Sequence, residues 1–194
     1  MGTSVEALGA RRRMRLIRPS ADGLQGIACT SAPRYLLAVS SAVVSSINVS
    51  RGGVPKLPVP HAQVGALGLS GDQQRWRHHG GPERAVCLYA LERIEALRDE
   101  GHPIAPGGAG ENLTLSGVDW DLLAPGAELR VGEALLRVTS YTEPCSKIAG
   151  CFMSGDFERV SQELHPGWSR VYASVVAPGL VRVGDPVLLL APAG

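Results

Sequence analysis

From residue 35 onward, short runs of β-branched and aliphatic residues alternate with turns rich in glycine and proline. The run YLLAVSSAVVSSINVS (residues 35–50) leads into the turn sequence RGGVPKLPVP, and the run AQVGALGLS (residues 62–70) leads into a polar loop. Toward the C-terminus, Pro178-Gly179 and Gly184-Asp185 separate further apolar runs. Short runs with turns at regular spacing are typical of β-sandwiches and β-barrels. The sequence therefore predicts a mostly β, barrel-like fold with a few short helices.

Two segments carry helical patterns, and one carries a hairpin pattern. VCLYALERIEALRDEG (residues 86–101) has one apolar stripe and a terminal glycine, which predicts a packing helix. Its stripe consists of Leu91, Ile94 and Leu97. SGDFERVSQEL (residues 154–164) predicts a second helix, and Gly132-Glu133 predicts the turn of a β-hairpin between two alternating runs.

The length and charge of the chain bound its organisation. A chain of 194 residues is long enough for one well-buried domain. The net charge of +1 hides a basic N-terminal segment, since residues 1–34 carry six arginines and two acidic residues, whereas the remainder is slightly acidic. This segment lacks periodicity and the apolar core of a secretory signal. We expect residues 1–34 to form a disordered extension and residues 35–194 to form a single domain.

Composition also excludes several classes of partner. An acidic body argues against a protein that binds duplex nucleic acid. No apolar run approaches the roughly 20 residues that a membrane-spanning helix needs, which argues against a membrane protein. The four cysteines include no CxxC pair, so neither a zinc site nor a compact disulfide framework is indicated. Reduced thiols in the cytoplasm are the expectation.

The segment TEPCSKIAGCF (residues 142–152) holds the most reactive candidate side chain. Cys145 lies between Pro144, which ends the preceding strand, and Lys147, one of only two lysines. A nearby cation and the start of a helical turn would stabilise a thiolate. Cys145 is therefore a candidate nucleophile or soft-metal ligand, although a small buried hydrophobe fits the local sequence equally well. Cys87 and Cys151 are expected to be core residues.

Other polar clusters suggest an anionic ligand. In HHGGPERA, Gly80 and Gly81 let backbone amides approach an anion, and His79 and Arg84 flank them as donors. An ordinary glycine turn is the alternative. GAGENLT offers the amide of Asn112, which suits the edge of a heteroaromatic ring. Lys56 follows a turn as a candidate anion contact, or simply as a solubilising surface lysine.

Five segments together resemble a known family: SINVSRGGVPKLPV, GLSGDQQRWRHHGGPERAVCLYALE, GHPIAPGGAGENLTLSGVDWDLLAPGAELRVG, EPCSKI and GDPVLLL. In this order they are similar to stand-alone MOSC domain proteins, named for the C-terminal domain of molybdenum cofactor sulfurases. The resemblance covers residues 45–190. It is strongest to small bacterial members linked to resistance against N-hydroxylated purines. It implies a mostly β fold that binds the molybdenum cofactor, a pterin dithiolene with a terminal phosphate.

The resemblance also implies roles for individual residues. The family cysteine that matches Cys145 ligates molybdenum or is proposed to carry a persulfide. Glu111 and Asn112 would then read the pterin edge, and Asp72 would orient other side chains. The remaining candidates would contact the phosphate or the surroundings of the metal: Lys56, His79, Gly80, Gly81, Arg84 and Arg170.

Three functions are compatible with these residues. The first is a molybdenum-dependent reductase of N-hydroxylated bases or related N-hydroxy compounds. It would draw electrons from a separate flavin-dependent reductase, because the chain has neither a GxGxxG fingerprint nor iron–sulfur cysteine spacing. The second is a sulfur carrier with a persulfide on Cys145, supplied by a pyridoxal-phosphate cysteine desulfurase. The third is a non-catalytic carrier of the cofactor.

Overall fold

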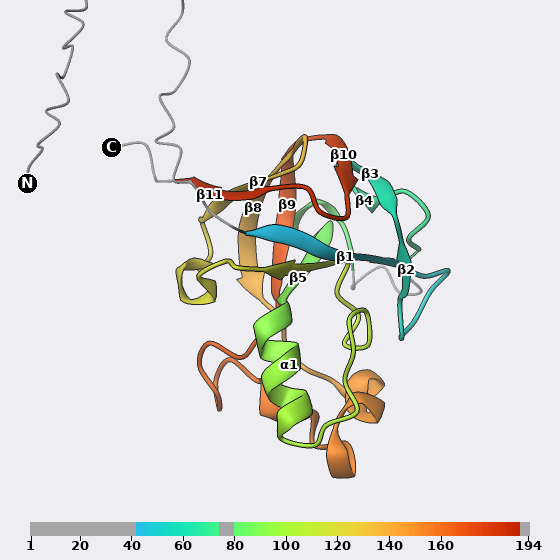
Figure 1. The fold of residues 1–194 in the computed structure, drawn as a ribbon, viewed down its shortest axis with the longest axis vertical. Coiled ribbons are helices and arrows are strands. Elements are labelled where there is room, and N and C mark those ends of the chain that lie inside the picture. Colours follow the sequence, from blue (N-terminus) through green and yellow to red (C-terminus); the bar gives the residue numbers. More distant parts are fainter. Residues whose placement is uncertain (1–41, 74–79, 191–194) are drawn as a thin grey trace, which may run out of the picture. The chain divides into compact units, whose positions relative to one another are not determined.

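A computed structural model describes residues 42–73 and 80–190 of the chain. The predicted boundary at residue 34 and the first part of the predicted run 35–50 lie outside these residues. The described strands are β1 (Val43–Val49), β2 (Leu57–Val59), β3 (His61–Gly65), β4 (Gly68–Leu69), β5 (Val86–Ala90), β6 (Leu113–Ser116), β7 (Glu128–Val131), β8 (Ala134–Tyr141), β9 (Val171–Ala177), β10 (Gly179–Arg182) and β11 (Val187–Leu190) (Figure 1). The helices are α1 (Leu91–Asp99) and the short 3-10 helices η2 (Pro82–Arg84), η3 (Trp120–Leu122), η4 (Ser146–Cys151), η5 (Met153–Gly155) and η6 (Phe157–Val160). The predicted mostly β fold with few helices is confirmed.

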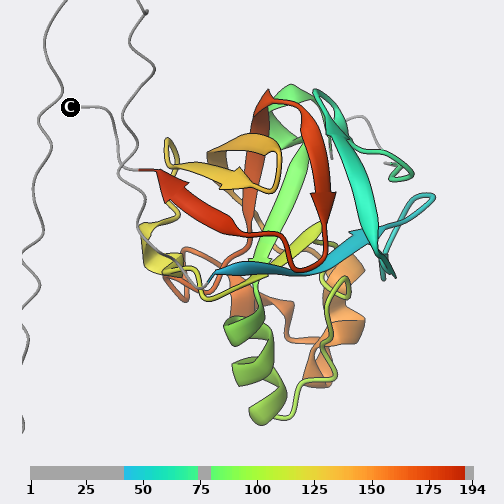
Figure 2. The same cartoon turned by 45° about the horizontal axis from the view of Figure 1, so that its top comes forward.

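Eight strands form one curled sheet, in the order β11-β7-β8-β9-β5-β6-β1-β2. β5 and β6 run parallel, and the other neighbouring pairs run antiparallel. The sheet bends until β1 meets the residue before β11, where Val43 pairs with Pro186 (Figure 2). Since a single bridge joins these two strands, the sheet is barrel-like without a full ladder at that seam.

The second sheet has the order β10-β3-β4. One of its segments differs from the prediction. The run 62–70, expected as one strand, is a tight hairpin in which β3 pairs with β4. Gly68 adopts a φ of 122°, and a Cβ there would lie 2.7 Å from the Ala85 carbonyl oxygen. Only glycine permits both this conformation and this close approach, so the chain turns where an uninterrupted strand was predicted.

The segment 86–101, predicted as one helix, begins with a strand. Residues Val86–Ala90 form β5, and only Leu91–Asp99 are helical. All five residues of β5 are buried, and the strand is an interior strand of the sheet, with β9 and β6 on its two sides. A fully buried strand shows no alternation, so its apolar run merges with the start of a helix pattern. The buried side chains of α1 are those of Ile94 and Leu97, two members of the predicted stripe.

The other two expected elements had opposite outcomes. Instead of one helix at 154–164, the chain forms the 3-10 helices η5 and η6, because the backbone leaves helical geometry at Asp156 (ψ 71°) and again at Ser161 (ψ 130°). The hairpin around Gly132-Glu133 is confirmed, with β7 paired to β8.

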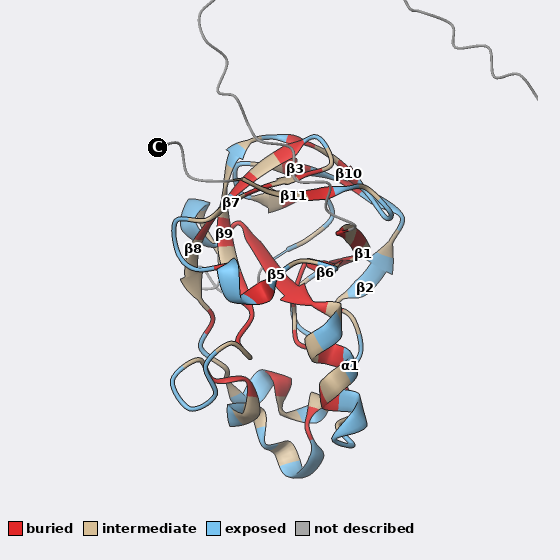
Figure 3. Cartoon of the chain, turned by 60° about the vertical axis from the view of Figure 1, so that its left-hand side comes forward, coloured by how far each residue is buried: buried red, intermediate tan, exposed pale blue. Residues whose placement is uncertain are grey.

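The buried residues lie mainly on the strands and on one side of α1 (Figure 3). The core is built from aliphatic side chains of the strands, with Tyr89 and Trp120 packed edge to face. No helix of the described residues is long and apolar enough to span a bilayer. The polar side chains described next are carried by the strands around this core and by the loops that connect them.

Candidate functional site

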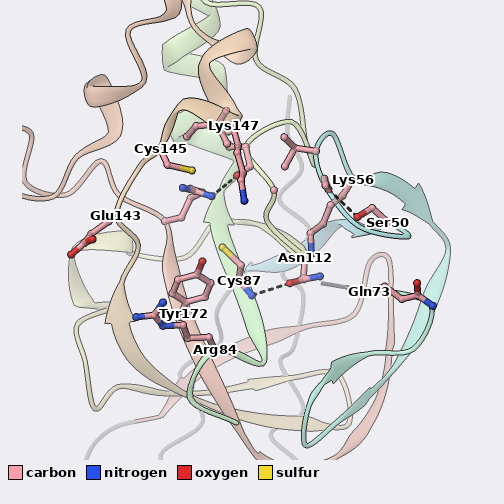
Figure 4. A pocket seen from close by; sticks show the side chains of 16 residues that line it. Ser50, Lys56, Gln73, Arg84, Cys87, Asn112, Glu143, Cys145, Lys147 and Tyr172 are labelled. Carbon is pink, nitrogen blue, oxygen red and sulfur yellow. Dashed lines mark hydrogen bonds between the residues drawn. The ribbon is translucent and has the colours of Figure 1, made fainter. Parts of the chain in front are cut away.

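A pocket of about 370 Å³ opens where several segments distant in sequence converge. The loop before β2, the start of β5, the loop before β6, the segment after β8 and the start of β9 all contribute to its wall (Figure 4). Its polar lining includes Lys56, Arg84, Cys87, Asn112, Cys145, Lys147, Arg170 and Tyr172. Most of the sequence-predicted candidates that the structure describes therefore come together.

Cys145 lies on the wall of this pocket and immediately precedes η4. Its backbone is extended, and its carbonyl accepts a hydrogen bond of 3.1 Å from the Ile148 amide. The predicted helical turn at this segment is confirmed as the 3-10 helix η4. The turn brings Lys147 to the wall of the same pocket, so a cation accompanies the thiol as the sequence predicted.

Cys87, which was expected to be a core residue, is a second thiol of the pocket. It is buried, but it lies on β5 directly opposite Tyr172 of β9, and opposed residues of an antiparallel pair share one face. Burial raises the pKa of the Cys87 thiol to about 11, so this thiol stays protonated at neutral pH. Cys151, by contrast, packs against the core and does not line the pocket.

Four cationic side chains line the pocket, against one acidic side chain, that of Glu143. Arg170 is 6% exposed; its Nη1 donates to the Ala109 carbonyl, while its buried Nε has no hydrogen-bond partner among residues 42–73 and 80–190. The guanidinium carbon of Arg84 lies 5.5 Å from the centre of the Tyr172 ring. An unpaired buried N–H and an excess of positive charge suit an anionic ligand.

The Asp72 carboxylate is the common acceptor for three residues of the pocket wall: Lys56, Asn112 and Ser50. Its Oδ2 lies 2.5 Å from Lys56 Nζ and accepts a 2.8 Å hydrogen bond from Asn112 Nδ2, while its Oδ1 accepts from the Ser50 amide. Asn112 Oδ1 in turn accepts from the Cys87 amide at 3.1 Å. Asp72 therefore fixes the positions of Lys56 and Asn112, and much of the hydrogen-bonding capacity of Asn112 is used within the protein.

Residues 75–188, more than half of the chain, match the family model of the MOSC domain. The chain belongs to the MOSC domain family. It is 34% identical to the protein YiiM of Escherichia coli (strain K12) over 130 residues, 64% of this chain and 57% of YiiM. It is 32% identical to the uncharacterized protein YflK of Bacillus subtilis (strain 168) over 114 residues, 58% of this chain and 51% of YflK. The chain thus spans little more than half the length of these two curated relatives.

Solved structures agree with this family assignment. The crystal structure of YiiM from Geobacillus stearothermophilus superposes with a TM-score of 0.61 at 27% identity, covering 77% of this chain and 75% of that one. Cys145, Lys56, Arg84 and Asn112, which lie in the segments that carry the MOSC resemblance, line one pocket of this chain together with Arg170.

The other candidates from the MOSC resemblance do not line the pocket. Glu111 is completely buried, and burial raises the pKa of its carboxyl. Gly80 and Gly81 precede η2 and do not contribute to the wall, although Arg84 at the end of η2 does. His79 lies outside the described residues. Glu111 was expected to read the pterin edge with Asn112, but its side chain turns away from the pocket wall and accepts a hydrogen bond from the Gly107 amide.

The 107–110 segment presses against the loop that carries Lys56. Gly107 has a φ of 80°, and a Cβ on it would collide with the Lys56 carbonyl oxygen. We expect Gly107→Ala to lower the free energy of unfolding by about 3 kcal/mol, because backbone strain and overpacking add. The matched control is Gly126→Ala, whose φ of 99° is equally unfavourable but whose Cβ would meet nothing within 4 Å, so its cost is expected near 1 kcal/mol. Equal losses in urea titrations of the two variants would contradict the close approach.

Proposed function

We propose that this MOSC protein binds the molybdenum cofactor in the pocket around Cys145 and reduces N-hydroxylated bases or related N-hydroxy compounds there. The observation that carries the proposal is the position of the Cys145 thiol on the wall of a pocket with four cationic side chains. A thiolate suits a soft metal, and fixed cations suit a phosphate. The pocket volume falls in the range of cofactor sites.

The side chains that could act as metal ligands favour a metal that is already bound by other ligands. Among residues 42–73 and 80–190, no three histidine, cysteine, aspartate or glutamate side chains are placed to hold a metal ion. A metal at Cys145 therefore needs further ligands from outside these described residues, and the two sulfurs of a dithiolene are such ligands. Arg170 Nε, which has no hydrogen-bond partner among the described residues, and the ammonium of Lys56, which keeps further N–H donors beside its contact with Asp72, would face the phosphate end.

The cofactor and the pocket residues would have separate roles in the proposed reaction. When bound, the cofactor supplies the two-electron reduction in which an N-hydroxyl group and two protons become an N–H group and water. Cys87 keeps its proton because burial raises its pKa, which leaves Cys145 as the thiol that would hold the metal. Burial also raises the pKa of Tyr172, so its phenol stays protonated and can donate a hydrogen bond to a bound molecule.

The proposal requires a partner and a compartment. Electrons would come from a separate flavin-dependent reductase, since the chain has no dinucleotide fingerprint of its own. Cys87, Cys145 and Cys151 are unpaired, and a reducing cytoplasm keeps such thiols free.

The test is the cofactor content of the purified protein. We expect wild-type protein from cells that make molybdopterin to carry about one molybdenum and one pterin per chain, and Cys145→Ala to lose the metal. Cys151→Ala is the matched control, because Cys151 packs against the core outside the pocket. If neither molybdenum nor pterin accompanies the wild type, the reductase is ruled out, and a persulfide on Cys145 would support the sulfur carrier.

A further inference from the structure

Glu111 is a completely buried carboxyl that lies off the pocket wall. Its Oε1 accepts a 2.6 Å hydrogen bond from the Gly107 amide and a 3.1 Å hydrogen bond from the Thr114 hydroxyl. Its Oε2 has no hydrogen-bond partner in the part of the chain that the structure describes. A buried carboxyl is costly, so a structural reason for retaining one at this position is expected.

The turn that Glu111 holds connects two cations of the pocket. The Gly107 carbonyl accepts from the Lys56 amide at 2.9 Å and from the Gly110 amide at 3.1 Å. The carbonyl of Ala109, two residues along, accepts from Arg170 Nη1. One short turn thus fixes the backbone of Lys56 and the guanidinium of Arg170.

The turn has little room to move independently of the pocket. A Cβ on Gly110 would lie 2.9 Å from a methyl group of Val54, and Gly107 approaches the Lys56 carbonyl more closely still. Because the turn packs this tightly against residues 54–56, any displacement of Gly107 shifts Lys56 and the acceptor of Arg170 together.

We propose that Glu111 is a positioning residue for anion binding: through the Gly107 amide it sets the turn that aims Arg170 and Lys56 into the pocket. The inference rests on the proposed function, in which these cations receive the phosphate of the cofactor. It replaces direct contact of Glu111 with the ligand by an indirect role. What matters in this role is an acceptor oxygen at the reach of a glutamate side chain, and not the negative charge.

Two substitutions of Glu111 separate the effect of side-chain length from the effect of charge. Glu111→Gln keeps an acceptor oxygen at full length without the charge, whereas Glu111→Asp keeps the carboxyl but withdraws it by one methylene. We expect the dissociation constant for inorganic phosphate to rise about tenfold in Glu111→Asp and to stay within about threefold of wild type in Glu111→Gln. The exposed Glu163 provides the control variant Glu163→Gln, which should bind as wild type does.

The measurement is calorimetric titration of the full-length, cofactor-free protein with inorganic phosphate at fixed pH, well below the unfolding temperature of each variant. Thermal unfolding without phosphate reports stability separately. Unchanged affinity in Glu111→Asp, or a loss in Glu111→Gln equal to that in Glu111→Asp, overturns the positioning role. No saturable binding to wild type, together with a normal unfolding transition, instead overturns the anion site of the proposed function and the inference with it.

Discussion

An Asp72→Ala variant is expected to be about 3–5 kcal/mol less stable than the wild type, because it leaves a buried cation without its counter-charge. The side chains of Asp72 and Lys56 are only 4% and 11% exposed, and their polar atoms lie 2.5 Å apart. The Asp72 carboxylate also accepts from Asn112 and from the Ser50 amide, so its removal takes an acceptor away from three donors. The loss should therefore far exceed that of a surface ion pair.

Urea denaturation of Asp72→Ala beside Arg182→Ala measures this difference. Arg182 pairs with Glu133 at 3.6 Å, and both side chains are more than half exposed, so the control should stay within about 0.5 kcal/mol of wild type. A fall of the midpoint at an unchanged slope identifies a loss of native stability. Similar midpoints for the two variants would contradict the inferred role of Asp72 as the buried centre of this wall.

The elements that the sequence predicted correctly are those with local signals. The β7–β8 hairpin follows from a two-residue turn between alternating runs, and η4 follows from Pro144 and the residues after it. β5 was missed because a strand buried on both faces loses its alternation, and a helix follows it without a break. The position of a strand within a sheet depends on partners that are distant in sequence.

The residues of the site were likewise predictable only where the signal is local. Cys145 and Lys147 are two positions apart, so their joint presence on one wall was predictable from the local chain. Cys87 joined the site only through its pairing with Tyr172, which is set by the β5–β9 register and has no local signal. Residues that are adjacent in sequence can also differ: Asn112 lines the pocket, while the side chain of Glu111 turns away from it toward the Gly107 amide.

A Cys145→Ser variant is expected to lose reduction of an N-hydroxylated purine by at least about a hundredfold, while its unfolding midpoint stays close to that of wild type. The activity falls because an alcohol is a far poorer ligand for a soft metal than a thiolate. The fold persists because Cys145 is only partly buried, and the hydrogen bond that it makes to η4 uses its backbone carbonyl. The assay supplies protein from molybdopterin-producing cells with an artificial electron donor, so that the identity of the natural reductase does not matter.

The other cysteines of the described chain make this result specific. Cys151→Ser is expected to retain nearly full activity, since Cys151 lies off the pocket wall and packs against the core. Cys87→Ala is expected to retain the metal, because burial keeps that thiol protonated and Cys145 remains in place. If Cys87→Ala loses activity as completely as Cys145→Ser does, the two pocket thiols act as a pair, and a sulfur-transfer reaction becomes the better account of the site. If Cys145→Ser stays active, the thiol is not the ligand, and the cations of the pocket must hold the cofactor without it.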